Sequence, residues 1–154
     1  MAGFLDLRTS LLAAIVLVAG CSDKAALEPD AALPQSVIPL SDQFGSDFAL
    51  KGTDGALVTD EDLKGKVSLI YFGFATCPDV CPMALGRMSA ALDLLSEAER
   101  KAVNALFITV DPERDTPERL AAYLAFDTRL RGLTGDAAAI KAAKASFKVY
   151  AEPE

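Results

Sequence analysis

The 154-residue sequence contains no histidine and no tryptophan, and it contains only three cysteines. Structural zinc sites and iron–sulfur clusters usually need four cysteine or histidine ligands. A single chain of this composition therefore cannot complete either kind of site. Nucleic-acid binding is also disfavoured, because 22 acidic residues outnumber 15 basic ones and leave a net charge of −7.

The sequence also lacks an apolar run long enough to cross a bilayer as a helix, which takes about 20 residues. Its first apolar run, residues 11–18, leads into residues 17–21, Leu-Val-Ala-Gly-Cys. This arrangement predicts a signal peptide over residues 1–20. The small residues before Cys21 resemble the lipobox of bacterial lipoproteins, so we expect a lipid on Cys21 that tethers the chain to a bacterial membrane, outside the cytoplasm on its periplasmic face. An ordinary secretory signal that leaves Cys21 free is the alternative.

The next segment, residues 21–36, shows no sustained hydrophobic period and contains two prolines. We interpret it as a tether between the lipid and the folded part of the chain. One small domain is then expected over residues 37–154. Its first predicted feature is a β-hairpin, because two short apolar segments flank the turn-forming residues 52–55.

Short apolar runs and helical patterns alternate in the rest of the domain. Residues 67–74 and 105–110 predict buried strands, and residues 83–96 between them carry the apolar stripe of an amphipathic helix. A strand–helix–strand unit of this length predicts a parallel strand pair, and thus an α/β fold. A short helical turn is expected at residues 96–101 and an extended segment from residue 148. Other helices should begin at good cap residues, namely Thr59, Thr116 and Asp136.

The only two cysteines of this domain, Cys77 and Cys81, stand where a predicted strand gives way to a predicted helix. The N-terminus of a helix favours a thiolate over a thiol. If Val80 and Cys81 are already helical, the two thiols lie one turn apart, close enough for a disulfide or for one shared metal ion. A structural disulfide is the alternative, but so small a loop gains little stability from a bridge. We therefore expect a redox or soft-metal role.

A charged loop, residues 111–115, follows the second predicted strand of the parallel pair. It should lie at the same edge of the sheet as the cysteine turn, because parallel strands end at the same edge. Ligand sites of open α/β sheets gather there.

Three motifs, in order and at natural spacing, resemble the Sco (SenC/PrrC) family over roughly residues 38–150. They are residues 73–82, Gly-Phe-Ala-Thr-Cys-Pro-Asp-Val-Cys-Pro; residues 109–117, Thr-Val-Asp-Pro-Glu-Arg-Asp-Thr-Pro; and residues 132–135, Gly-Leu-Thr-Gly, followed by Val149 and Tyr150. The resemblance implies a thioredoxin-like fold and a membrane-anchored protein that binds copper outside the cytoplasm. It further implies a metallochaperone for the copper-centre subunit of cytochrome c oxidase, acting as copper donor, as reductant of that centre's cysteines, or both.

Within this resemblance, Cys77 and Cys81 match the copper-binding cysteines of the family. Asp111 matches an acid of the second motif, and we carry it over as a supporting or partner-docking residue, with a capping, solvated loop acid as the alternative. The family's third copper ligand is a histidine in a later loop, and this sequence has none. Two thiolates could still hold Cu(I), which prefers sulfur, with lower affinity and a greater loss for Cu(II).

The missing histidine has two explanations at the sequence level. The coding sequence is cut short, or the protein is truly short and the strand of residues 67–74 lacks an antiparallel neighbour. In the second case an apolar strand edge is open to aggregation. We expect the 154-residue product, expressed alone, to be poorly soluble or unstable.

Two other functions use the same cysteines. A thiol–disulfide oxidoreductase would let one thiolate attack and the other resolve, although the pair has one more intervening residue than the usual thioredoxin motif. A peroxiredoxin would need a threonine three residues before its reactive cysteine, and Phe74 and Pro78 occupy those places. The sequence therefore ranks copper binding first, thiol exchange second and peroxide chemistry last.

Overall fold

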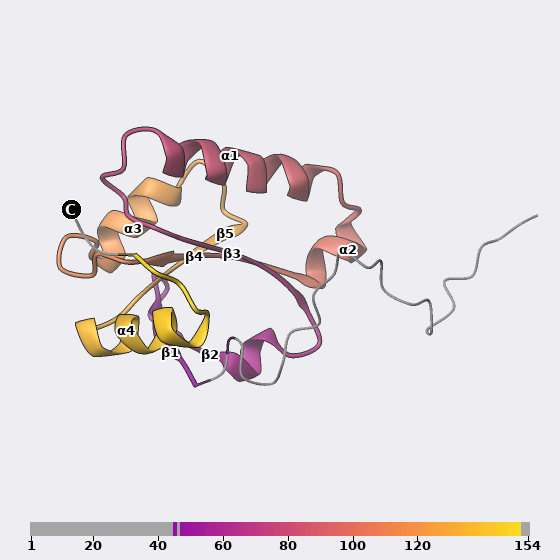
Figure 1. Cartoon of the computed structure of the whole chain (residues 1–154). Coiled ribbons are helices and arrows are strands. Elements are labelled where there is room, and N and C mark those ends of the chain that lie inside the picture. The colour runs from indigo at the N-terminus through magenta and orange to yellow at the C-terminus, as the bar shows by residue number, and fades with distance from the viewer. Residues whose placement is uncertain (1–44, 46, 152–154) are drawn as a thin grey trace, which may run out of the picture. The chain divides into compact units, whose positions relative to one another are not determined.

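The computed structural model describes residue 45 and residues 47–151. The predicted signal peptide, the predicted lipidation site Cys21 and the predicted tether lie outside these residues. The described domain is built on one mixed sheet of five strands in the order β2-β1-β5-β4-β3 (Figure 1). None of the described helices has both the length and the apolar character that crossing a bilayer demands.

The order of elements along the chain agrees with the α/β pattern expected from the sequence. The strands are β1 (Ala49–Gly52), β2 (Leu57–Thr59), β3 (Val67–Gly73), β4 (Val103–Thr109) and β5 (Leu130–Thr134). The helices are η1 (Asp60–Leu63), α1 (Val80–Asp93), α2 (Glu97–Lys101), α3 (Pro117–Leu124) and α4 (Ala137–Ser146). Strands β3, β4 and β5 run parallel, and the β1–β2 hairpin joins them through antiparallel pairing of β1 with β5. The predicted parallel pair and the predicted N-terminal hairpin are thus confirmed.

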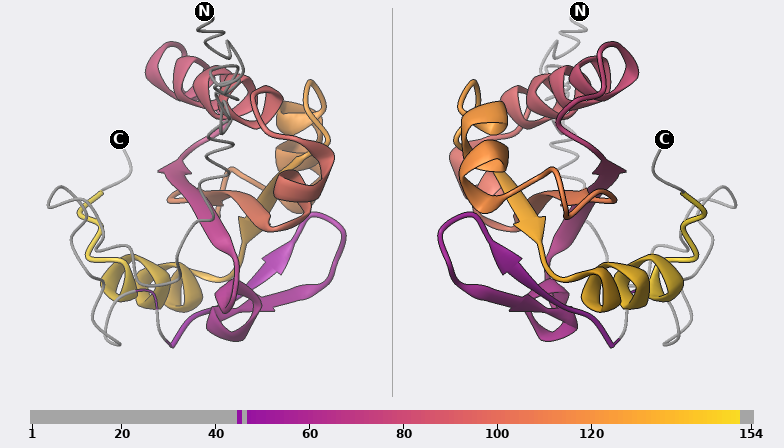
Figure 2. Two further views of the ribbon diagram at one scale, coloured as in Figure 1. Left: turned by 90° about the vertical axis from the view of Figure 1, so that its right-hand side faces the viewer. Right: turned by 90° about the vertical axis from the view of Figure 1, so that its left-hand side faces the viewer.

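Strand β4 lies between the two hydrophobic layers of the domain. Because side chains of a strand alternate between its faces, Ala105 and Phe107 pack on one layer while Leu106 and Ile108 pack on the other. The first layer is covered by α1 and α3 and the second by α4, as Figure 2 shows from two further sides. The β1–β2 hairpin, which belongs to the same sheet, adds Leu50 and Val58 to the second layer. Helices on both faces of a parallel sheet bury its central strand completely.

The predicted cap residues begin helices, as expected. The side chains of Thr116 and Asp136 each accept the N–H of the third helical residue, at 3.3 and 2.7 Å. Asp62 accepts the N–H of Thr59 at 2.8 Å and closes the short η1 turn. In the hairpin, Gly55 has a φ of 82°, a conformation that glycine adopts without strain.

Three local predictions need correction. The long helix spans Val80–Asp93 rather than residues 83–96, because Pro82 fits the first turn and Leu94 and Leu95 make tighter i→i−3 bonds. Strand β5 was not predicted, because its five residues include Arg131 and Gly132. The segment from residue 148 turns rather than extends: Lys148 has a φ of 54°, and the Val149 N–H bonds back to the Lys144 carbonyl at 2.8 Å.

Strand β3 stands at the edge of the sheet in the described part of the chain, where it pairs only with β4. Its seven residues include no charge and no proline, the usual devices that protect a strand edge. The expected poor solubility of the isolated product stays a prediction. A monodisperse monomer with a cooperative thermal transition would contradict it.

Candidate metal-binding and redox site

The two cysteines lie on the turn that joins β3 to α1, as the sequence predicts. Val80 and Cys81 are the first two residues of α1, and Cys77 stands before the helix. Figure 1 shows the turn that leads from β3 into α1. Both thiols are free. The backbone N–H of Cys81 donates to the sulfur of Cys77 at 3.4 Å, so the two residues are in direct contact across the first turn of the helix.

The environments of the two thiols differ. Cys77 is 9% exposed and Cys81 only 3% exposed. The thiol of Cys81 donates a hydrogen bond that lowers the pKa of Cys77, and the helix N-terminal N–H groups of Cys81, Asp79 and Val80 lower it further. Burial raises the pKa of Cys81, as does its hydrogen bond to Cys77. The arrangement thus favours a thiolate on Cys77 and a protonated thiol on Cys81.

Tyr71 is a site residue that the sequence analysis did not single out. Its hydroxyl donates to the sulfur of Cys81 at 3.7 Å, within the longer range of sulfur hydrogen bonds. Burial, followed by this hydrogen bond, raises the pKa of Tyr71 to about 12, so the hydroxyl remains a donor at neutral pH. The strand period gave a usable signal, because Tyr71 shares a face of β3 with Gly73 at the end of the strand.

Gly73 is required by the close packing around Cys81. A Cβ atom at this position would lie 3.0 Å from the Cys81 sulfur and 2.9 Å from the Tyr71 ring. Both distances are shorter than ordinary van der Waals contact, so any larger residue displaces the thiol, the ring or the strand end.

Asp111 is 5% exposed at the carboxyl end of the sheet, where its carboxylate pairs with Arg114. It lines a cleft of about 720 Å³ between the loop of residues 110–114 and helix α4. Within the described residues, no group of three or more Cys, Asp, Glu or His side chains converges as a metal site. The structure thus brings Cys77 and Cys81 together and places Asp111 at the same sheet edge, engaged with Arg114.

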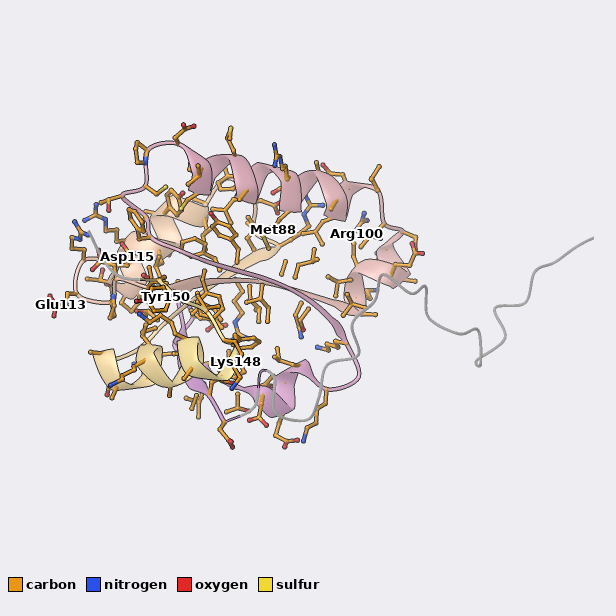
Figure 3. All side chains as sticks on the ribbon, viewed as in Figure 1. Met88, Arg100, Glu113, Asp115, Lys148 and Tyr150 are labelled. Carbon is orange, nitrogen blue, oxygen red and sulfur yellow. The ribbon has the colours of Figure 1, made fainter. Side chains whose placement is uncertain are left out.

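Asp115 lies beneath the cysteine turn and was also missed as a site residue. Its side chain is fully buried, and one carboxyl oxygen, Oδ2, accepts the Ala75 N–H at 2.9 Å and the Thr109 hydroxyl at 2.7 Å. Glu113 of the same loop projects outward in Figure 3, whereas the Asp115 side chain is 0% exposed. No sequence signal could reveal this contact, because Ala75 and Asp115 are 40 residues apart.

The sequence model of the family described as SCO1/SenC matches residues 38–154. Protein sco1 of Schizosaccharomyces pombe is 48% identical over 109 residues, which cover 70% of this chain and 41% of that protein. The chain therefore spans about two fifths of the length of this relative.

Two solved structures are also similar. ScoI of Bradyrhizobium japonicum with copper bound has 46% identity and a TM-score of 0.67, and the match covers 71% of this chain and 69% of that one. BsSco, described as having a disulfide switch and as a member of the Sco family of cytochrome c oxidase assembly proteins, has 31% identity and a TM-score of 0.60. That match covers 71% of this chain and 67% of the BsSco chain. These similarities confirm the thioredoxin-like fold expected from the sequence.

Proposed function

The chain belongs to the SCO1/SenC family, and we propose that it is a copper-binding protein that assists assembly of the copper centre of cytochrome c oxidase. Cu(I), its cargo, is held by the sulfur atoms of Cys77 and Cys81. The relative solved with copper bound and the relative described as an oxidase assembly protein support this proposal. The partner we propose is the copper-centre subunit of the oxidase.

The observation that carries the proposal is the hydrogen bond from the Cys81 backbone N–H to the Cys77 sulfur, which brings the two cysteines together at the start of α1. The Cys81 N–H lies 3.4 Å from the Cys77 sulfur, and neither cysteine is in a disulfide. Cu(I) is a soft ion that prefers thiolate ligands and accepts low coordination numbers. Two sulfur atoms held on one helical turn suit it, and they suit Cu(II), which prefers imidazole and oxygen, less well.

The protonation states of the two thiols favour the release of a proton when the metal binds. Cys77 already has a lowered pKa, and Cu(I) would displace the proton of Cys81 when its sulfur becomes a ligand. Tyr71 would then donate its hydroxyl to a metal-bound sulfur and keep the side chain of Cys81 oriented. These residues therefore hold, orient and partly desolvate the ion.

Asp111 supports the site rather than ligating the metal. Its carboxylate is paired with Arg114 and faces the cleft beside α4. We propose that this acidic loop end contributes to partner docking, with lipid on Cys21 holding the protein on the periplasmic face of a bacterial membrane. Loss of membrane association after Cys21→Ser would support the anchor; unchanged association would contradict it.

Cu(I) titration against a competing chelator tests the copper proposal. We expect the reduced Cys21→Ser protein, which retains only the thiols of the site, to bind one Cu(I) per chain. Cys77→Ser or Cys81→Ser in that background should abolish tight binding. Binding of Cu(I) that survives either change would refute the assignment, and absence of binding in the Cys21→Ser protein would refute the function.

The unequal thiols favour a second candidate, a thiol–disulfide oxidoreductase. Cys77 thiolate would attack a substrate disulfide and release one substrate thiolate; Cys81 would then attack the Cys77 sulfur, release the second thiol and leave a Cys77–Cys81 disulfide. A dithiol reductant must reduce this bridge before another cycle. Turnover of a disulfide substrate with such a reductant and a strong copper chelator present would favour this candidate.

A further inference from the structure

The turn between β3 and α1 is held by the next loop of the sheet. Its Gly73 carbonyl accepts the Val110 N–H at 2.8 Å, and its Ala75 N–H donates to Asp115 at 2.9 Å. The Cys77 N–H bonds within the turn, to the Phe74 carbonyl at 3.2 Å. Among these bonds, only that of Asp115 comes from a side chain.

We propose that Thr109 and Asp115 are positioning residues that fix the cysteine turn and thereby set the spacing of the two sulfur atoms. We call the set of Ala75 N–H, Thr109 hydroxyl and Asp115 carboxyl the carboxyl clamp. Its consequence for metal retention rests on the proposed Cu(I) function. The hydrogen bonds that define the clamp are present in the structure and do not depend on that function.

The two side chains of the carboxyl clamp are fully buried. Thr109 and Asp115 are both 0% exposed, and both donors reach the same oxygen, Oδ2. The other oxygen, Oδ1, has no hydrogen-bond partner within the described residues. A buried polar atom without a partner costs about 1–3 kcal/mol, so stability alone does not explain a carboxyl group here.

The Thr109 hydroxyl links the clamp to the loop that bears Asp111. It donates to Asp115 Oδ2 at 2.7 Å and accepts the N–H of Asp111 at 3.0 Å. The beginning and the end of the charged loop thus converge on one hydroxyl, which is linked to Ala75 of the cysteine turn through Asp115 Oδ2. A displacement of this loop, for example by a docking partner, would be transmitted to Ala75.

Preorganisation explains why the position of the cysteine turn matters for metal binding. A site whose ligands are already placed loses less conformational freedom when the ion binds. Cys81 is fixed by the helix and by its burial, whereas Cys77 precedes the helix and depends on the turn. The clamp therefore acts on the less constrained thiol of the pair.

Two threonines offer a matched test. Thr109→Val removes the hydroxyl that contacts the Asp115 carboxyl, while Thr134→Val removes a similarly buried hydroxyl that donates to the Asp115 backbone carbonyl at 3.3 Å. Thr109→Val removes two buried hydrogen bonds, one to Asp115 Oδ2 and one from the Asp111 N–H, and Thr134→Val removes one; only the first change breaks the clamp. Each variant is made in the Cys21→Ser protein and compared for amide hydrogen exchange of Ala75 and for Cu(I) affinity.

We expect Thr109→Val to speed exchange at Ala75 and to weaken Cu(I) binding, each by about tenfold, and Thr134→Val to change either by less than about threefold. Asp115→Ala should act at least as strongly as Thr109→Val. Asp115→Asn should restore most of the protection, because an amide oxygen can accept both hydrogen bonds.

Equal behaviour of Thr109→Val and Thr134→Val would overturn the proposal, even if Asp115→Ala fails to fold. Faster exchange with unchanged Cu(I) affinity would overturn the link between the clamp and the metal. If the Cys21→Ser protein binds no Cu(I), the proposed function fails, and hydrogen exchange at Ala75 still decides whether the clamp exists.

Discussion

Buried polar groups are partnered differently at the two ends of the parallel strands. At the amino end of β5, Arg129 forms a fork with Asp127 and a second ion pair with Asp93, each with a 2.7 Å contact. At the carboxyl end, Cys77 and Cys81 remain free, and Asp115 keeps one oxygen without a partner within the described residues. The amino end pairs its buried carboxylate with an arginine, whereas the carboxyl end, besides the Asp111–Arg114 pair, keeps free thiols and a carboxyl oxygen without a partner within the described residues.

The difference separates stability from reactivity. Bidentate pairs between arginine and a nearly buried carboxylate are strong and specific, so the amino end should hold the domain together. Buried thiols and an unpartnered carboxyl oxygen contribute little to stability and are common at functional sites. Changes at the amino end should therefore lower the stability of the domain without altering the thiols, whereas changes at the carboxyl end should alter the thiols with a smaller loss of stability.

The largest effect is expected from Asp127→Asn at the amino end. The Arg129 guanidinium holds the pKa of Asp127 well below its usual range. Loss of this carboxylate leaves a half-buried arginine with poorer partners, so we expect a fall of about 2–3 kcal/mol in the free energy of unfolding near neutral pH. Urea unfolding measures it, and the alkylation rate of Cys77 in the folded state should be unchanged.

The sign of the pH dependence follows from the lowered pKa of Asp127. Its stabilising contribution is complete above the unfolded pKa, near 3.8, and is lost as the pH falls towards the folded pKa. The stability difference between wild type and Asp127→Asn should therefore shrink in acid. A difference that grows below pH 3.8 would contradict the assignment.

Gly73→Ala is the next largest test and acts at the carboxyl end. The added methyl group would contact the Cys81 sulfur and the Tyr71 ring, so we expect a cost of about 1–2 kcal/mol and weaker Cu(I) binding. Gly86→Ala in α1 is the matched control, because its added Cβ meets no atom within 4 Å and should stabilise the helix by up to about 1 kcal/mol. Unchanged Cu(I) affinity in Gly73→Ala would show that the packing does not position Cys81.

Tyr71→Phe should have a smaller effect that is confined to Cys81. The Tyr71 hydroxyl donates to the Cys81 sulfur and lowers the pKa of that thiol. Without it, alkylation of Cys81 at a fixed pH should slow by about threefold. Tyr123→Phe is the control, because the Tyr123 hydroxyl is buried without a hydrogen-bond partner in the described part of the chain. Equal effects of the two changes would remove Tyr71 from the site.

The smallest effect is expected at the exposed ion pairs. Lys64 pairs with Glu61 and Lys101 with Glu97, and all four side chains are largely exposed. Lys64→Ala and Lys101→Ala should each change the unfolding free energy by less than about 0.5 kcal/mol, with the remaining difference screened by salt. A larger loss in thermal or urea unfolding would mean that stability is not concentrated at Arg129.

The sequence predicted the parts of the site that depend on local pattern. The periods of residues 67–74 and 83–96 placed Cys77 and Cys81 on a strand-to-helix turn, and the structure confirms that placement. It did not predict that one thiol would be more buried than the other, because burial depends on how α1 packs on the sheet. The contact of Asp115 also escaped, since it joins residues that only the tertiary fold brings together. The contact of Tyr71 was missed although Tyr71 shares a face of β3 with Gly73 at the end of the strand.

Dependence on the tertiary fold also explains why the sequence analysis did not predict strand β5. Residues 130–134 contain an arginine and a glycine, so their local pattern resembles a loop. In the structure, β4 and β1 pair with the two edges of β5, and Arg131 reaches Asp54 of the hairpin at 3.0 Å. Pairing on both sides outweighs a weak intrinsic strand propensity.

The pH dependence of alkylation at Cys77 and Cys81, followed by mass spectrometry on the reduced Cys21→Ser protein, tests the central claim most directly. The account predicts that Cys77 reacts first, with a pKa below the ordinary thiol value of 9.0, and that Cys81 titrates above it. Two thiols that titrate together near 9.0, or a Cys81 that reacts before Cys77, would contradict an unequal pair set by the helix N-terminus and burial.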